Sequence, residues 1–119
     1  MKIDLNYIKR LVDNLSKNKK IFGVYIFGSF LTGKRGADSD IDLCIIGKFN
    51  EIDKKKILRK MPEVFDVSFF DELPIFIKIR VFKSGKKLFI RDEEKIREIM
   101  FNTLKEYRDF MPFMERRMK

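Results

Sequence analysis

The sequence predicts an α/β (α+β) fold, in which helices pack on a small mixed β-sheet. Apolar residues recur every three or four positions near both chain ends, as on one face of an amphipathic helix. Short runs rich in β-branched and aromatic residues lie between these segments and are typical of strands. At 119 residues the chain can build one substantial core, so we expect a single domain covering residues 1–119.

The first helix and the first strand are predicted within residues 3–27. Residues 3–17 carry an apolar stripe at helical spacing, made of Ile8, Leu11, Val12 and Leu15. Residues 21–27 are mainly β-branched and aromatic, which favours a strand. This strand ends at Gly28 and Ser29, in the position where phosphates commonly bind in α/β folds.

Residues 29–70 predict a short helix, two strands and a crossover helix. The short helix covers residues 29–34, and a loop over residues 34–38 leads to a second strand at residues 40–46. The crossover helix covers residues 51–61 and ends before Pro62. We expect its apolar side to consist of Ile52, Ile57, Leu58 and Met61. A third strand covers residues 64–70 and carries Asp66 within an otherwise apolar run.

The last third of the chain begins with an ambiguous segment. Residues 73–82 are rich in β-branched side chains, which favours a strand, but Pro74 suits a first helical turn and Gly85 suits a helix C-cap. A short strand follows at residues 87–91, and Asp92 caps the last helix. Its apolar stripe consists of Ile96, Ile99, Met100, Leu104, Tyr107 and Met111.

Composition excludes several classes of function. The chain has no histidine, which excludes His-based catalytic triads and His-ligated zinc. The single cysteine, Cys44, lies in an apolar run and is expected in the core. No apolar stretch reaches the roughly 20 residues of a membrane span, so we expect a cytoplasmic protein that does not contact membranes. The formal net charge of +9 suits binding to nucleic acid or to an acidic protein surface, or is simply that of a lysine-rich chain.

A pair of carboxylates, Asp40 and Asp42, opens the second strand. Because side chains alternate along a strand, both project from one face, while Ile41 and Leu43 project from the other face into a core. Two carboxylates held this close repel each other unless they share a proton or bind a hard cation. Mg²⁺ fits best, since it takes oxygen ligands from carboxylates and substrate phosphates.

The turn after the first strand supplies a complementary phosphate site. Gly28 lets the backbone approach a phosphate closely, and Ser29 opens a helical turn whose free N–H groups and hydroxyl can hold phosphate oxygens. Together with Asp40 and Asp42, this arrangement predicts a nucleoside triphosphate site with its metal.

This pattern resembles a known family. Gly28-Ser29, ten intervening residues, Asp40-x-Asp42 and a further carboxylate on a later strand resemble the signature of the DNA polymerase beta-like nucleotidyltransferases. The chain's brevity and its continuation from residue 65 to residue 92 resemble the minimal nucleotidyltransferases (MNT), the antitoxin partners of HEPN-domain toxins. The resemblance covers about residues 21–110 and implies the polymerase beta-like nucleotidyltransferase fold, with a helix rather than a strand at residues 73–82.

The resemblance also implies a reaction. Asp40, Asp42 and Asp66 would be catalytic metal ligands for two Mg²⁺ ions, and Asp66 would also accept the proton of the attacking hydroxyl. Gly28 and Ser29 would bind the nucleotide. ATP would then donate AMP to a tyrosine of a cognate HEPN toxin, with release of pyrophosphate, and stable nucleic-acid binding is not expected. From the strand pattern alone, Asp66 could equally be an exposed charge on an edge strand.

Two other classes of function remain open from the sequence. One is a nucleotidyltransferase that acts on RNA or a small molecule, although such enzymes usually add a second domain for the acceptor. The other is a non-catalytic antitoxin that silences its partner by binding.

Two further features suggest partner contacts. The apolar run Phe110-Met111-Pro112-Phe113-Met114 could form a docking site near the chain end, although a helical apolar stripe is more often core. Lys78 and Arg80 are candidates for a triphosphate or partner contact, with a solvated face as the alternative.

Overall fold

A computed structural model describes the backbone of residues 4–28 and 41–118, and side chains up to residue 112. The predicted helix at residues 29–34 and the loop that follows it lie outside these ranges. The described elements are α1 (Leu5–Leu15), β1 (Ile21–Phe27), β2 (Ile41–Gly47), α3 (Glu51–Arg59), β3 (Phe65–Phe69), the 3-10 turn η1 (Phe70–Glu72), α4 (Ile75–Ser84), β4 (Lys86–Ile90) and α5 (Glu93–Met118).

The four strands form one mixed sheet in the order β3-β2-β1-β4. β1 pairs antiparallel with β2 on one side and with β4 on the other. β2 and β3 are parallel, and α3 forms the crossover between them that parallel strands require. The sheet is therefore mixed, as the sequence predicts, and β3 and β4 are its edge strands.

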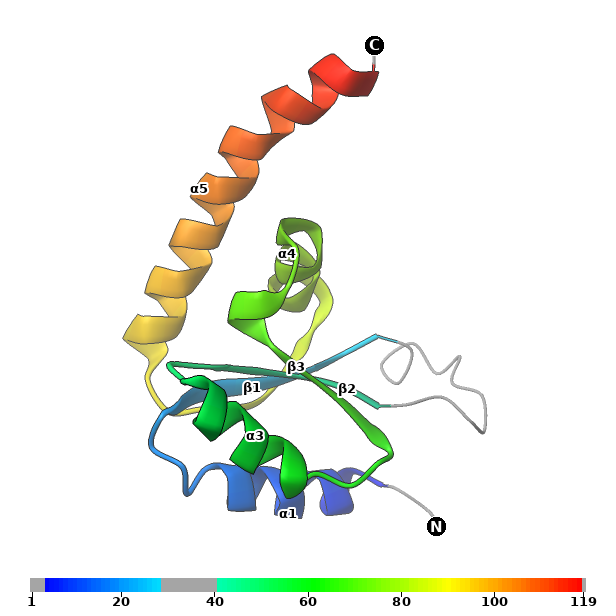
Figure 1. The fold of residues 1–119 in the computed structure, drawn as a ribbon, viewed down its shortest axis with the longest axis vertical. Coiled ribbons are helices and arrows are strands. Elements are labelled where there is room, and N and C mark those ends of the chain that lie inside the picture. Colours follow the sequence, from blue (N-terminus) through cyan, green and yellow to red (C-terminus); the bar gives the residue numbers. More distant parts are fainter. Residues whose placement is uncertain (1–3, 29–40, 119) are drawn as a thin grey trace.

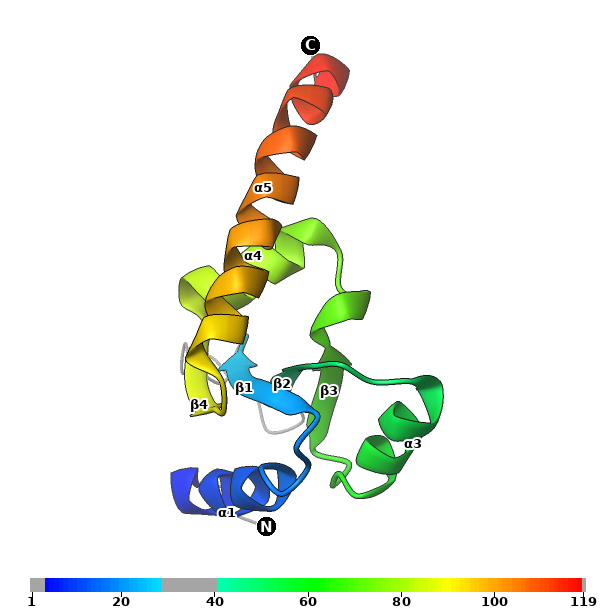
Figure 2. The same cartoon turned by 90° about the vertical axis from the view of Figure 1, so that its left-hand side faces the viewer.

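Helices cover both faces of the sheet (Figures 1 and 2). α1 and α3 pack on one face, where Ile8, Val12 and Ile57 contact the inward side chains of β1, β2 and β3. α4 and α5 cover the other face, whose buried cluster consists of Tyr25, Cys44, Ile46, Phe70, Val81 and Ile96. Because β1 and β2 lie between these two layers, their middle residues are buried on both sides.

The prediction for the buried side of α3 is confirmed for Ile57 and Met61, which lie in or against the core, and is wrong for the other two residues. Ile52 and Leu58 are exposed, whereas Ile57 and Lys54 are buried. Lys54 is buried because its ammonium group bonds Asp71 at 3.1 Å and Glu72 at 2.9 Å, and it lies 5.4 Å from the centre of the Phe69 ring. The long aliphatic stem of the lysine thus fills the place that an apolar residue would take.

The C-terminal elements confirm most expectations and correct two. α4 is a helix, as the resemblance implies, and Asp92 caps α5 by accepting a hydrogen bond from the Lys95 backbone N–H at 3.1 Å. α5 continues through Pro112 to Met118, beyond the predicted stripe. Leu104 is exposed, contrary to prediction, while Thr103 is buried and its hydroxyl donates a hydrogen bond to the Ile99 carbonyl at 2.7 Å. In the described part of the chain, no helix has the length and apolar character needed to cross a membrane.

The buried thiol of Cys44 generates a prediction about pH. Burial, with a smaller contribution from Asp71, raises the pKa of Cys44 from 9.0 to about 12. Since the neutral thiol is favoured in the folded state, its contribution to stability is complete below pH 9 and is lost as the pH rises toward 12. Urea unfolding at stepped pH should show that Cys44→Ala loses less stability over this interval than wild type. If both proteins lose the same amount of stability, ionisation of Cys44 does not contribute to the loss.

Candidate active site

The described members of the predicted site, Gly28, Asp42 and Asp66, lie at one end of the sheet. In the strand register, Phe27 of β1 is opposite Asp42 of β2, and Asp42 is opposite Asp66 of β3. Gly28 directly follows Phe27. Ser29 and Asp40 are outside the described residues, so the structure leaves their predicted roles as expectations.

Asp42 and Asp66 share a face of the sheet. Ile41 and Leu43 are buried in the core beneath α1 and α3, which places Asp42 on the opposite face, beside Cys44. Register partners on neighbouring strands point to the same side, and such strands lie about 4.8 Å apart. The structure therefore brings together two carboxylates that are distant in the sequence, on the face that α4 and α5 cover.

Gly28 packs directly against the carboxylate of Asp42. The backbone φ of Gly28 is +84°, a left-handed conformation that residues with a side chain rarely adopt. A Cβ atom at this position would lie 2.2 Å from Asp42 Oδ2, so only glycine leaves space for the carboxylate. The close approach that the structure shows at Gly28 is to a site carboxylate, and the predicted approach of its backbone to a phosphate stays a prediction.

Asp66 is exposed on the edge strand β3, whereas Asp42 is half-buried. Exposure fits the edge-charge interpretation of Asp66, but its register position beside Asp42 fits a site carboxylate as well. The geometry thus agrees with both interpretations of Asp66.

The donor set fits a hard cation such as Mg²⁺. Asp42 and Asp66 supply carboxylate oxygens, the ligands that Mg²⁺ prefers, and neither histidine nor an accessible thiol competes at this end of the sheet. Within residues 4–28 and 41–118, no three potential ligands cluster closely enough to hold a metal by themselves. A complete site therefore needs the predicted third carboxylate, Asp40, or oxygens from a substrate.

Two cations that no sequence pattern indicated lie beside this end of the sheet. β4 begins here, with Lys86 opposite Ile26 and Lys87 opposite Tyr25, and both lysines are exposed. Their nearness to the site depends on the pairing of β4 with β1, which no local sequence pattern indicates. Of the two cations that were predicted as candidates, Arg80 is exposed, whereas Lys78 lies 5.4 Å from the centre of the Phe70 ring.

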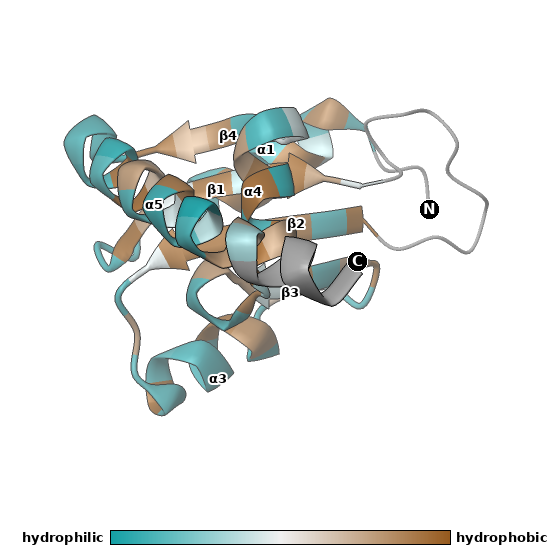
Figure 3. Cartoon of the chain, turned by 90° about the horizontal axis from the view of Figure 1, so that it is seen from above, coloured by the Kyte–Doolittle hydropathy of each residue, from teal (hydrophilic) through white to brown (hydrophobic). Residues whose placement is uncertain are grey.

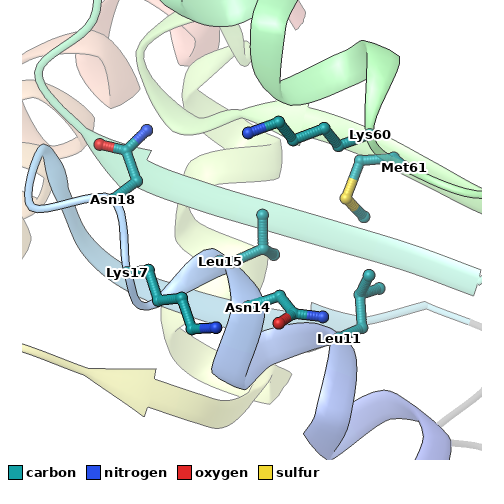
Figure 4. A pocket seen from close by; sticks show the side chains of 7 residues that line it. All are labelled: Leu11, Asn14, Leu15, Lys17, Asn18, Lys60 and Met61. Carbon is teal, nitrogen blue, oxygen red and sulfur yellow. The ribbon is translucent and has the colours of Figure 1, made fainter.

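A cavity on the opposite side of the molecule is separate from the candidate site. It lies between the C-terminal ends of α1 and α3, with a volume of about 510 Å³ (Figure 4). Its lining consists of Leu11, Asn14, Leu15, Lys17, Asn18, Lys60 and Met61. This lining contains no carboxylate, so it offers neither a metal ligand nor a general base of the kind that the predicted reaction needs.

Comparison with known proteins identifies similar sequences and structures. Residues 9–94 match the family described as Polymerase beta, Nucleotidyltransferase. A protein of Methanocaldococcus jannaschii, provisionally named a protein adenylyltransferase, is 33% identical over 103 residues, which cover 84% of this chain and 77% of that protein.

Solved structures share the fold at lower sequence identity. A toxin–antitoxin crystal structure with AMP-PNP matches with a TM-score of 0.71 and 17% identity, covering 93% of this chain and 98% of that chain. A Shewanella oneidensis complex of a tri-AMPylated HEPN toxin with its MNT antitoxin matches with a TM-score of 0.62 and 18% identity, covering 96% and 95%.

The contact between Gly28 and Asp42 predicts the effect of Gly28→Ala. The positive φ should cost roughly 1–2 kcal/mol of stability, and the new methyl group must displace the Asp42 carboxylate. Chemical denaturation should therefore show a modest loss of stability, while calorimetry should show MgATP affinity reduced by about tenfold or more. Ser84→Ala, an exposed change at the nearby end of α4, is the control. If Gly28→Ala binds MgATP as tightly as wild type, the Asp42 carboxylate does not take part in nucleotide binding.

Proposed function

Because the chain belongs to the polymerase beta nucleotidyltransferase family, we propose that it transfers AMP from ATP to a tyrosine hydroxyl of a partner protein, a HEPN-domain toxin, and thereby acts as its antitoxin. The observation that carries this proposal is the placement of Asp42 beside Asp66 and against Gly28, at the end of the sheet where the nucleotide is expected.

Each site residue has a distinct role in the proposed reaction. Gly28 allows close approach of the ATP phosphates, and the Ser29 hydroxyl donates a hydrogen bond to them. Asp40, Asp42 and Asp66 would hold Mg²⁺, which would supply positive charge to offset the negative charge of the triphosphate during transfer. Asp42 and Asp66 are register partners and project from the same face of the sheet.

The transfer step is a displacement at the α-phosphorus of ATP. The tyrosine oxygen forms a bond to this phosphorus while the bond to the bridging oxygen of pyrophosphate breaks. Asp66 accepts the phenolic proton, because it is the more exposed of the two described carboxylates and can reach an incoming acceptor. The products are AMP-tyrosine on the partner and free pyrophosphate.

Similar proteins support a protein acceptor over RNA or a small molecule. The relative that is 33% identical carries the name of a protein adenylyltransferase. Among the structures that share the fold, one contains AMP-PNP, an ATP analogue, and another contains an AMPylated HEPN toxin. In the described part of this chain, all elements join one sheet and its two covering layers, so the acceptor must dock from outside.

A labelling experiment tests the acceptor. The chain is co-expressed with the product of its neighbouring gene, purified, and incubated with Mg²⁺ and ATP labelled at the α-phosphate. We expect label on tyrosine of the partner protein, and Asp42→Asn should reduce the rate by several orders of magnitude. Label on RNA alone would favour the RNA-directed alternative. Tight partner binding without label on any molecule would favour a non-catalytic antitoxin.

Thermal unfolding tests the role of Asp42 without an acceptor. Ligand that binds only the folded state raises its stability by RT ln(1 + [L]/Kd). Addition of MgATP at 100 times its Kd should therefore stabilise wild type by about 2.7 kcal/mol, and addition to the isosteric variant Asp42→Asn should have little effect. Asp13→Asn, on α1 across the sheet, is the matched control and should respond like wild type. An Asp42→Asn variant that responds as strongly as wild type would contradict the proposed site.

A further inference from the structure

α4 carries one exposed stripe that the proposed reaction does not use. The exposed residues of this helix are Phe76, Arg80, Lys83 and Ser84, and its other residues are half-buried or buried. Positions 76, 80 and 83 are four and then three residues apart, so they lie on one side of the helix. We call these three residues the α4 track, which is roughly 10 Å long at 1.5 Å per residue.

The C-terminal end of the α4 track borders the candidate site. α4 ends at Gly85, where a Cβ atom would lie 3.4 Å from the Ile26 carbonyl oxygen of β1. Lys86 then pairs with Ile26, two residues before Gly28. The track therefore leads toward the end of the sheet that carries Asp42 and Asp66.

The other end of the track lies against aromatic side chains of α5. The Phe76 ring is 6.0 Å from the ring of Tyr107 and 5.5 Å from the ring of Phe110, and both pairs meet edge to face. Phe76 remains 42% exposed in this cluster. Seen from above, α4 lies over the sheet beside α5 (Figure 3). Phe76 is near the first residue of α4, at the end of the helix opposite Gly85.

The sequence segment that contains the track is strongly basic. No acidic residue occurs from Leu73 to Arg91, a segment that contains Arg80, Lys83, Lys86 and Lys87. As far as the structure describes the chain, none of these four cations lies within 4 Å of a carboxylate. Arg80 and Lys83 lie on the exposed side of α4, so their charge is available to a molecule that approaches this helix.

We propose that the α4 track docks an acidic segment of the acceptor protein and directs its hydroxyl group to the candidate site. An apolar residue of the segment packs on Phe76, and carboxylates face Arg80 and Lys83. The geometry fits, because three or four extended residues, at about 3.3 Å each, span the track. This inference rests on the proposed function, since the docked segment belongs to its protein acceptor.

Two other occupants fit the track less well. Proteins that bind single-stranded nucleic acid offer open ring faces on which successive bases stack along a basic groove. Here the aromatic rings gather at one end and contact one another edge to face. A second copy of the chain would bring Arg80 and Lys83 against like charges, which is unfavourable.

The experiment measures binding of a defined acidic probe. Fluorescence anisotropy at low salt follows binding of a labelled random copolymer of glutamate and tyrosine to the full chain. The double variant Arg80→Glu/Lys83→Glu should weaken binding by roughly tenfold or more, with MgATP affinity unchanged. The control, Lys9→Glu/Arg10→Glu, alters two exposed cations on α1 across the sheet. Each replacement subtracts two charges, so both double variants change the net charge from +9 to +5.

Several results would overturn the proposal. They are failure of the copolymer to bind wild type, equal weakening by the two double variants, and loss of MgATP affinity in Arg80→Glu/Lys83→Glu. Displacement of the copolymer by an equimolar 20-residue oligothymidylate would assign the track to nucleic acid instead. Melting temperatures of both variants verify that they fold.

The acceptor reaction separates failure of docking from failure of the proposed function. With a labelled acceptor in hand, Arg80→Glu/Lys83→Glu should raise the KM for the acceptor by about tenfold and leave kcat near wild type. If wild type labels no protein, the proposed function fails, while the copolymer measurement still decides whether the track binds acidic segments. If transfer proceeds with an unchanged KM in this variant, the docking proposal fails and the proposed function stands.

Discussion

The register of β2 is the constraint on which the candidate site depends. β2 pairs with β1 on one side and with β3 on the other, and these two registers place Asp42 next to the end of β1 and opposite Asp66. A slip of one residue would turn Asp42 into the core that holds Ile41 and Leu43, at the high cost of a buried charge. The apolar pattern of β2 therefore fixes the geometry of the carboxylates.

On the face of the sheet that α4 and α5 cover, burial decreases toward the site, although Ile41 and Phe65 remain buried on the opposite face. Residues 43–46 of β2 are buried, but Asp42 is half-buried and Asp66 is exposed. Like charges directly opposite each other on neighbouring strands are destabilising, and access to water and cations moderates this repulsion. The two apolar layers on β1 and β2 supply the stability that lets the strand ends hold such a pair.

Local sequence patterns predicted the elements that form the site better than the contacts around it. β1 spans the predicted residues 21–27, and the alternation around Asp42 gave the correct face, because strand geometry is local. The buried side of α3 could not be predicted, since the partners of Lys54 come from η1, 17 and 18 residues further along the chain. Similarly, the neighbourhood of Lys86 depends on the pairing of β4 with β1, across 60 residues of chain.

Because of the order of its elements along the chain, the two faces of the sheet can be covered at different times during synthesis. The layer formed by α1, α3 and three strands uses residues 5–69, so it can assemble once these residues have left the ribosome. The opposite face waits for α4, β4 and α5, which begin at residue 75. Until then, Tyr25, Cys44 and Ile46 are uncovered, and β1 has an open edge that can pair with other chains. The face that carries Asp42 and Asp66 is thus the last to close, and a nascent chain is most prone to misassembly on the side where its chemistry will later take place.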